Sequence, residues 1–425
     1  MLLKDINPGV VGSNPSFLFQ SGDVIFFQAS TLSAGGELWK TDGTPEGTVM
    51  VKDIRPGNLG SAPGQFINVN GIVYFTASTD VEGTELWKTD GTANGTVLVK
   101  DINPGGATGW GNHFLSYNNT LYFAADDGVN GLELWKTDGT AEGTVMVKDI
   151  APGASTSAIA NLTLSGDYFY FRATNSVDGV ELWKSDGTAE GTFLLKDVYP
   201  GPTGGLTQFA SFLKDINGTL FFQANDGTHG LELWVTDGTE AGTRMVKDIN
   251  PGVDNSMFTN TNLLTNYNGK LVFTANNGTN GFELWTSDGT ETGTYMVADI
   301  NPGAGNGSPN FYTPFQNELI FGADNGTNGR EPMKIGSIVT AQSSQAYIEL
   351  IRNVYPNPGS GVYYFELNDN IGPVQTTVLN CEGKVVHETS GTSVDISKLP
   401  DGIYTLKTTS GNEVHYNRVV KVNQK

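Results

Sequence analysis

The chain has 425 residues, and its 24 Lys+Arg against 45 Asp+Glu give a net charge of −21. An acidic balance of this size argues against nucleic acid or an anionic membrane as the main partner, because both are polyanions. The single cysteine, Cys381, excludes an internal disulfide framework and thiolate clusters for zinc or iron–sulfur. No apolar run reaches about 18 residues, so no transmembrane helix is expected.

An internal repeat dominates most of the chain. An octad that begins Glu-Leu-Trp and ends Asp-Gly-Thr occurs six times, at intervals of 48 or 51 residues. Its tryptophans are Trp39, Trp87, Trp135, Trp183, Trp234 and Trp285. A worn seventh copy, Gly329 to Lys334, carries Met333 where the others carry tryptophan. Repeats of this length indicate a solenoid, a propeller or another array of supersecondary units.

The two ends of the array complement each other. Each of the first six octads is followed by a Lys-Asp-Ile-like block, and a further block, Leu3 to Gly9, stands at the start of the chain. The chain therefore opens with the end of a repeat and finishes the array with the beginning of one. An open solenoid gains nothing from complementary halves, whereas a closed ring does. We therefore expect the N-terminal strand to complete the last of seven propeller blades.

Each repeat is predicted to contain four short strands. A weak first segment is followed by a strongly aromatic one, such as Val24 to Phe27, then by Glu-Leu-Trp and by Val-Met-Val-Lys. Asp-Gly and Asn-Gly between them supply the positive φ that hairpin turns need. The strands are apolar on both alternations, which favours sheets packed between neighbours on both faces. We therefore predict an all-β fold in which the repeated tryptophans form the core between blades.

The Glu-Leu-Trp-x-x-Asp-Gly-Thr octad resembles the ELWxxDGT repeat family of bacterial secreted proteins. The resemblance covers about residues 1–335, and we assign residues 1–336 to the propeller. It implies a secreted or surface protein and no defined activity.

The chain changes character after the array. A short low-complexity linker, 337–345, leads to residues 346–425, where short alternating segments predict a small antiparallel β-sandwich. This part resembles the type A C-terminal sorting domain of type IX secretion substrates, through its Tyr-Pro-Asn-Pro opening, its Asp-Ile-Ser-x-Leu-Pro-x-Gly-Ile-Tyr segment and its basic last strand. The residues that match the sorting motif are Tyr355, Pro356, Asn357, Pro358, Gly383, Lys384, Leu399, Pro400, Gly402, Tyr404 and Lys421.

That resemblance implies a route and partners. The protein would reach the periplasm by a cleavable signal, which Met1 to Asp5 do not show, and would be secreted or placed on the cell surface through the type IX outer-membrane translocon. Residues 346–425 would bind the translocon and its barrel-type shuttle protein. A cell-surface sorting protease would cut within 337–350.

Carboxylates recur in the repeat, but we expect no cofactor. Calcium is the alternative, since rings of loop carboxylates could bind it. Each Asp-Gly-Thr loop offers a single carboxylate, however, whereas calcium takes six to eight oxygens. We therefore expect these groups to accept backbone N–H groups in turns or to meet neighbouring lysines.

Evidence for catalysis in the sequence is weak. None of the four histidines, His113, His229, His387 and His415, recurs in the repeat, and no Gly-x-Ser-x-Gly or nucleotide-binding loop is present. Trp110 and His113, near the insertion Gly105 to Asn112, are the most individual surface feature. Cys381 is expected in a core.

We therefore predict a non-enzymatic exported protein whose propeller is a platform for binding or adhesion to an unknown surface ligand or glycan. Type IX systems often coexist with gliding motility, so a motility-associated role is a further expectation. The alternative is a secreted glycan-active hydrolase or a lectin that uses the propeller face, with paired carboxylates as acid and base.

Overall fold

The computed structural model describes residues 2–109, 113–206, 212–258, 264–336, 351–355, 360–367, 374–380, 384–410 and 413–422. The chain divides into two compact units, Met1–Thr340 and Ala341–Lys425, and each is described by itself below. The described residues contain strands and turns without any helix, and so no helix that could cross a membrane.

The first unit consists of consecutive antiparallel sheets, each a meander in chain order. The first sheet contains β1 (Ser16–Ser21), β2 (Val24–Thr31), β3 (Gly35–Thr41) and β4 (Val49–Lys52). The second contains β5 (Gly64–Val69), β6 (Ile72–Thr79), β7 (Gly83–Thr89) and β8 (Val97–Lys100). The third contains β9 (Leu115–Tyr117), β10 (Thr120–Asp126), β11 (Leu132–Thr137) and β12 (Val145–Lys148). The fourth contains β13 (Ala160–Ser165), β14 (Tyr168–Thr174), β15 (Val180–Ser185) and β16 (Phe193–Lys196).

The remaining sheets of this unit continue the pattern until the last one. The fifth contains β17 (Lys214–Ile216), β18 (Thr219–Asn225), β19 (Leu231–Thr236) and β20 (Arg244–Lys247). The sixth contains β21 (Thr265–Tyr267), β22 (Lys270–Asn276), β23 (Phe282–Ser287) and β24 (Tyr295–Ala298). The seventh has three strands, β25 (Asn310–Phe315), β26 (Glu318–Asp324) and β27 (Arg330–Ile335). The four segments predicted in each repeat are therefore strands in the first six sheets.

Side chains on both faces of the second strand are buried. In β2, the adjacent Phe26 and Phe27 are 3% and 5% exposed although they point to opposite faces. Phe26 belongs to a cluster shared with Phe75 and Trp87 of the second sheet, whereas Phe27 packs with Trp39 and with Ile6 of the N-terminal segment. The expectation of sheets covered on both sides is confirmed here.

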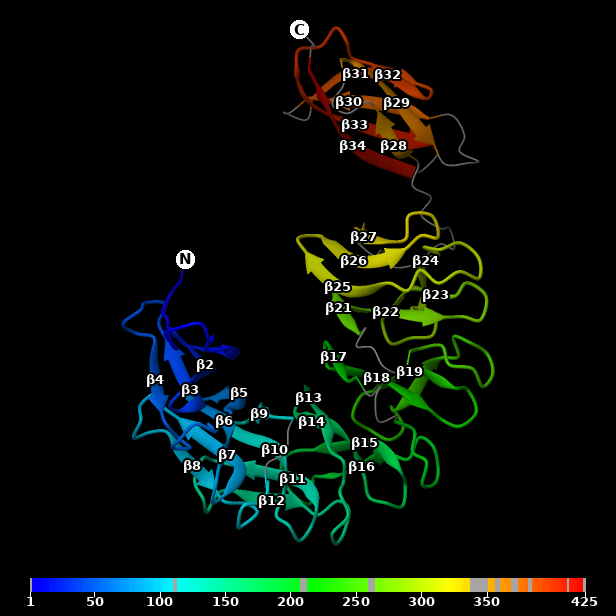
Figure 1. Ribbon diagram of the computed structural model, residues 1–425. Helices are drawn as coiled ribbons and strands as arrows, with labels where there is room; N and C mark the ends of the chain where they lie inside the picture. The colour runs from blue at the N-terminus through cyan, green and yellow to red at the C-terminus, as the bar shows by residue number, and fades with distance from the viewer. Residues whose placement is uncertain are drawn as a thin grey trace. The chain divides into compact units, whose positions relative to one another are not determined.

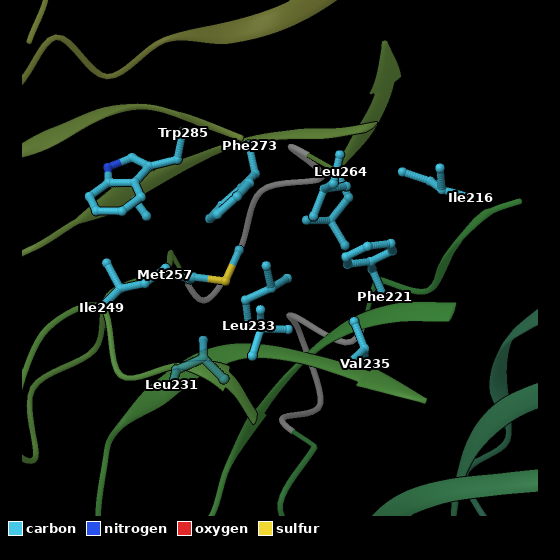
Figure 2. Close-up of a cluster of buried hydrophobic side chains, with 13 residues drawn as sticks. Ile216, Phe221, Leu231, Leu233, Val235, Ile249, Met257, Leu264, Phe273 and Trp285 are labelled. Carbon is cyan, nitrogen blue, oxygen red and sulfur yellow. The ribbon is translucent and has the colours of Figure 1, made fainter. Parts of the chain in front are cut away.

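The repeated tryptophans are buried, as the sequence predicted, and those of the second to sixth sheets lie against the preceding sheet, whereas Trp39 packs with the N-terminal segment. Their exposure is between 5% and 8%, and Trp285 of the sixth sheet packs against the apolar face of the fifth. Figure 2 shows this cluster, with Phe221 and Leu233 on one side and Phe273 and Trp285 on the other. Similar clusters join each sheet to the next, and consecutive sheets lie side by side in Figure 1. This is the packing of propeller blades.

Loops on one side of the sheets fit tightly together. Gly131, which closes the hairpin between β10 and β11, has a φ of +70°, and a Cβ there would overlap the carbonyl of Ser155 in the connector between β12 and β13. Only glycine allows both the positive φ and this approach. The connector after each fourth strand is thereby held against the hairpin of its own sheet.

The pairing expected between the N-terminal strand and the last blade is not formed in this structure. Within the described residues, 2–15 contain no strand, and β27 pairs with β26 alone. The segment lies instead on the first sheet, where Lys4 Nζ donates hydrogen bonds to the carbonyl oxygens of Thr48 at 2.6 Å and Pro45 at 3.0 Å. The contacts with the first sheet are therefore made, while the edge of β27 stays open.

The second unit is an antiparallel sandwich. One sheet has the order β28 (Ile351–Tyr355), β29 (Val362–Leu367) and β32 (Ser393–Asp395). The other has the order β31 (Val385–Ser390), β30 (Gln375–Leu379), β33 (Gly402–Ser410) and β34 (Glu413–Lys421). Tyr363 and Val394 of the first sheet share a buried cluster with Val378, Leu406 and Val419 of the second. The predicted linker, 337–345, lies outside the described residues.

Candidate functional site

The eleven residues that match the sorting motif lie between Tyr355 and Lys421 of the second unit, and the structure describes seven of them. Tyr355 is the last residue of β28, and Lys384 is an exposed residue before β31. The Lys384 N–H donates to Asn380 Oδ1 at 2.9 Å, which closes the turn between β30 and β31. Pro356, Asn357, Pro358 and Gly383 lie outside the described residues, as does Cys381.

The segment from Asp395 to Tyr404 is a hydrogen-bonded turn. Asp395 Oδ1 accepts the Ser397 N–H at 2.8 Å, and the Leu399 N–H donates to the carbonyl of Ile396 at 2.9 Å. The Tyr404 hydroxyl, on β33, donates to the carbonyl of Pro400 at 2.8 Å, so the ring fixes the end of the turn. The hydrogen bonds from Ser397 lower the pKa of Asp395. Leu399 packs against the core, so this part of the motif builds the fold.

Gly402 and Lys421 are opposite each other in the pairing of β33 with β34. The side chain of Lys421 is 1% exposed, and its Nζ lies 3.0 Å from Asp401 Oδ1. A buried ammonium group is costly unless it is paired and hydrogen-bonded. The lysine of the basic last strand therefore ties that strand to the turn before β33.

Of the described motif residues, Tyr404 and Lys421 are buried inside the sandwich, whereas Lys384 and Pro400 are exposed, and further exposed apolar side chains lie outside the motif. Tyr364 of β29 and Ile403 of β33 are 49% and 52% exposed, and each neighbours a buried tyrosine along its strand. Val385 of β31 is exposed as well. These apolar side chains were not singled out from the sequence. The alternation of apolar residues on both faces of β29 and β33 was the signal that could have identified them.

The glutamate of Glu-Leu-Trp is fully buried in all six complete sheets, with 0% exposure. Glu37 accepts the N–H groups of Ile54 at 2.9 Å, Arg55 at 3.3 Å and Ser61 at 2.8 Å, and the Ser61 hydroxyl at 2.6 Å. All these donors belong to the connector between β4 and β5. Each glutamate thus fastens the connector that leads to the next sheet.

Burial in this position changes the acidity of the glutamates. Desolvation raises the pKa of Glu85, Glu133, Glu181 and Glu232 to about 7, although backbone N–H groups oppose the shift. The nearby Asp101 adds to the rise at Glu85. A carboxyl group with a pKa near 7 can move a proton in a catalytic site. Here, however, its oxygens face backbone donors of a loop.

The aspartate of each Asp-Gly-Thr loop is exposed and organises its own turn. Asp42 Oδ1 accepts the N–H of Thr44 at 2.9 Å and its hydroxyl at 2.7 Å, and these bonds lower the pKa of Asp42. A Cβ at Gly47 would overlap the same carboxylate. The other five loops repeat the arrangement. Across the part of the chain that the structure describes, no three His, Cys, Asp or Glu side chains are grouped so as to hold a metal ion.

The histidines do not come together. His113 is half-buried and accepts the Asn161 N–H at 3.5 Å, and its pKa is lowered by burial and by Arg172. His229 lies 2.7 Å from Asp226 in a hairpin loop, and this contact raises the pKa of His229. Equivalent loops contain Asn130 against Asp127, so the pair is a variant of a structural contact.

His387 and His415 belong to strands of the second unit, and Trp110 lies outside the described residues. Of the insertion Gly105 to Asn112, which the sequence marked as the most individual surface, the structure describes residues 105–109.

Residues 353–422 match the family model of the secretion system C-terminal sorting domain. The match supports the type IX sorting domain that the sequence predicted, and with it secretion or cell-surface localisation. No curated protein matches the chain.

Several solved structures are similar to the chain at low identity and low TM-score. A prolyl endopeptidase is 9% identical with a TM-score of 0.40, over 94% of this chain and 54% of that one. A puromycin-hydrolysing peptidase from Mycobacterium tuberculosis is 11% identical with a TM-score of 0.39, over 84% of this chain and 59% of that one. Prolyl oligopeptidase B from Galerina marginata is 10% identical with a TM-score of 0.40, over 94% of this chain and 54% of that one. The chain thus spans little more than half the length of these structures, and their activities carry no argument for it.

Proposed function

We propose that this chain is a non-enzymatic secreted or cell-surface protein whose second unit is the address for type IX secretion. The observation that carries the proposal is the sorting-domain match over residues 353–422. The folded sandwich supports it, because the buried Lys421 and the Tyr404 turn belong to the matched segment. The translocon and its barrel-type shuttle protein are the proposed partners of this unit, and a surface protease is the proposed processor of 337–350.

The first unit is proposed to be a rigid platform for binding or adhesion. Its repeated carboxylates support a structural role, since the buried glutamates hold connectors and the loop aspartates hold turns. We propose that it is a seven-bladed propeller of the ELWxxDGT repeat family, closed by its N-terminal strand, that needs no cofactor. Service in surface motility is a narrower form of the same proposal.

Export of a truncated chain tests the address. The full-length protein and a chain that ends at residue 340 are expressed with the host's own signal sequence, and the cells are fractionated. We expect the full-length protein in the medium or on the surface and the truncated chain in the periplasm. Export of the truncated chain at the normal level would contradict the proposal.

A screen of the full-length protein tests the platform role. A glycan array and a hydrolysis panel are run with the same preparation. Binding without turnover, or neither, agrees with the platform, whereas turnover that follows the purified protein would establish a hydrolase instead.

A further inference from the structure

No described segment packs on the face of the seventh sheet that carries Ile320, whereas the corresponding face of each other sheet packs on the sheet that follows it. Glu331 on β27 is exposed, whereas the six glutamates at the same repeat position have 0% exposure. Ile320 is only partly buried, although its counterparts Tyr74 and Tyr122 are both 5% exposed. A hollow of about 340 Å³ lies on this face, lined by Phe311, Ile320, Phe321, Gly322, Arg330, Glu331 and Pro332. An apolar face of this kind is covered in every other sheet of the unit.

The N-terminal segment, residues 3–13, already behaves as the end of a repeat. Lys4 Nζ donates to the carbonyl of Thr48 at 2.6 Å, just as Lys52 Nζ donates to Thr96 at 2.7 Å. The Ser30 N–H donates to the carbonyl of Ser13 at 2.8 Å. The Ser78 N–H donates to the carbonyl of Ser61 at 2.8 Å in the same way. In each complete repeat, the fourth strand and the connector after it contact the following sheet. The N-terminal segment makes the same contacts with the first sheet.

The hydrogen bonds that each repeat makes to its buried glutamate are not formed by the N-terminal segment within the described residues. In the first complete repeat, the N–H groups of Ile54, Arg55 and Ser61 converge on Glu37. Counting back one repeat, the equivalent donors are the N–H groups of Ile6, Asn7 and Ser13. The equivalent carboxylate is that of Glu331. Among the described residues, the two ends of the array therefore hold N–H groups without the carboxylate of their repeat position and a carboxylate without its N–H donors.

We infer that the N-terminal segment docks on β27 of the same chain, with the N–H groups of Ile6, Asn7 and Ser13 on the carboxylate of Glu331. The inference rests on the proposed closure of the propeller by its N-terminal strand and adds the contacts with Glu331 that hold this strand in place. The pairing of β3 with β4 sets the register, so that Leu2 lies opposite Met333, as Met50 lies opposite Trp39. Docking brings the first sheet, on which the segment lies, over the hollow beside Ile320, as the third sheet covers Tyr74, and gives β27 a second strand partner besides β26. The segment of the same chain is favoured over a second copy because a tether raises its effective concentration.

Cysteine cross-linking tests whether the segment reaches β27. Leu2→Cys and Met333→Cys are introduced together in the full chain with Cys381→Ser, since residues opposite each other in antiparallel strands lie within disulfide range. The control pair, Lys40→Cys with Val49→Cys, is at adjacent positions of β3 and β4 and should cross-link under the same oxidation. We expect a monomeric cross-linked product from both. A disulfide-linked dimer from the Leu2/Met333 pair would assign the face to a second copy, and no cross-link would refute the docking; either result overturns the inference.

Hydrogen exchange tests the contacts with Glu331 separately from the closure of the propeller. We expect the peptide that covers residues 3–13 to be protected in the wild type and to lose that protection in Glu331→Ala. Glu318→Ala is the matched control, because Glu318 is a partly exposed carboxylate on the neighbouring β26. If the cross-link forms but Glu331→Ala leaves the exchange unchanged, the propeller is closed as proposed and the contacts with Glu331 are wrong. If neither the cross-link nor the loss of protection is observed, both the closure of the propeller and the contacts with Glu331 are wrong.

Discussion

Lys421 and Asp401 form an ion pair of 3.0 Å whose two members differ in their contact with water, since the lysine side chain is 1% exposed and the aspartate side chain 48%. The pair joins the last strand of the sorting unit to the turn before β33. An exposed partner can be solvated by water when the pair is broken, whereas the buried ammonium group cannot. Loss of the partner of the buried lysine should therefore cost more stability than loss of an ordinary surface charge.

Asp401→Ala should destabilise the second unit more than an equivalent change elsewhere on its surface. The substitution leaves the buried Lys421 with less compensation, and we expect a loss of about 2–3 kcal/mol in the free energy of unfolding. Lys398→Ala, an exposed residue of the same turn, is the control and should change stability by less than about 0.5 kcal/mol. Hydrogen exchange of β33 and β34 in the full chain provides the measurement. Equal exchange in the two variants would show that the pair contributes nothing.

Glu85→Ala should destabilise the first unit. Glu85 accepts the N–H groups of Ile102, Asn103 and Gly109, and alanine leaves these buried donors without an acceptor. We expect a cost of about 2–4 kcal/mol, and a smaller one for Glu85→Gln, whose amide oxygen still accepts. Tryptophan fluorescence during urea unfolding measures the change, because the repeated tryptophans lie in this unit. Glu142→Ala, in an exposed loop, should be near neutral.

The stability of the first unit should pass through a maximum in mildly acidic solution. The pKa of Glu85, Glu133, Glu181 and Glu232 is about 7 in the folded chain, against 4.5 for a glutamate side chain in water, so the folded state binds their protons more tightly and loses stability as the pH rises from 4.5 through 7. The pKa of the loop aspartates, such as Asp42, is lowered below 3.8, so their contribution is lost in more acidic solution.

We therefore expect a higher Tm at about pH 5.5 than at about pH 8 or about pH 3. Differential scanning calorimetry across this range checks the order. Glu85→Gln should flatten the fall between the two higher values, because it removes one of the titrating groups. A Tm that rises steadily up to pH 8 would contradict the burial of the glutamate carboxyls.

Arg172→Met should stabilise the first unit. Arg172, on β14, is 9% exposed, and the Nη1 of its guanidinium is buried with no hydrogen-bond partner in the described structure. Burial lowers the pKa of this group, which reflects the cost of keeping it charged there. Methionine fills similar space without that cost, and we expect a gain of about 1 kcal/mol, seen as a higher Tm. Arg244→Met, at a residue that donates to Gly289, should give no gain.

Removal of divalent cations should leave the melting of the protein unchanged. Each Asp-Gly-Thr loop places one carboxylate on its own threonine, which leaves too few oxygens for calcium. We expect Tm values in EDTA and in calcium to agree within about 1 °C, whereas a shift of several degrees corresponds to more than about 1 kcal/mol. A large drop in EDTA would favour the calcium alternative.

The repeat made much of the first unit predictable. Three segments of each complete repeat are strands as predicted: the aromatic second segment, Glu-Leu-Trp and Val-Met-Val-Lys. Their strand structure follows from apolar residues and flanking turn residues that lie only a few positions apart in the sequence. The tryptophan at a fixed repeat position has to be buried somewhere, and for Trp87 the preceding sheet supplies that surface. The sorting motif was likewise readable from Asp395 to Tyr404, where the contacts are local.

Contacts between segments far apart in the chain could not be read in the same way. The sequence marks Glu37 and Asp42 as two acidic residues in one octad, yet one is fully buried and the other organises an exposed turn. The buried one owes its environment to a connector up to 24 residues away, and the buried Lys421 is paired with Asp401, 20 residues before it.

The sequence alone determined the all-β character, the four-strand repeat and the secretion address, because these depend on periodicity and on short motifs. Only the tertiary structure decided which carboxylates are buried, which sorting residues form the core and which edge stays open. Burial is a property of surfaces that meet in space, and no local pattern contains it.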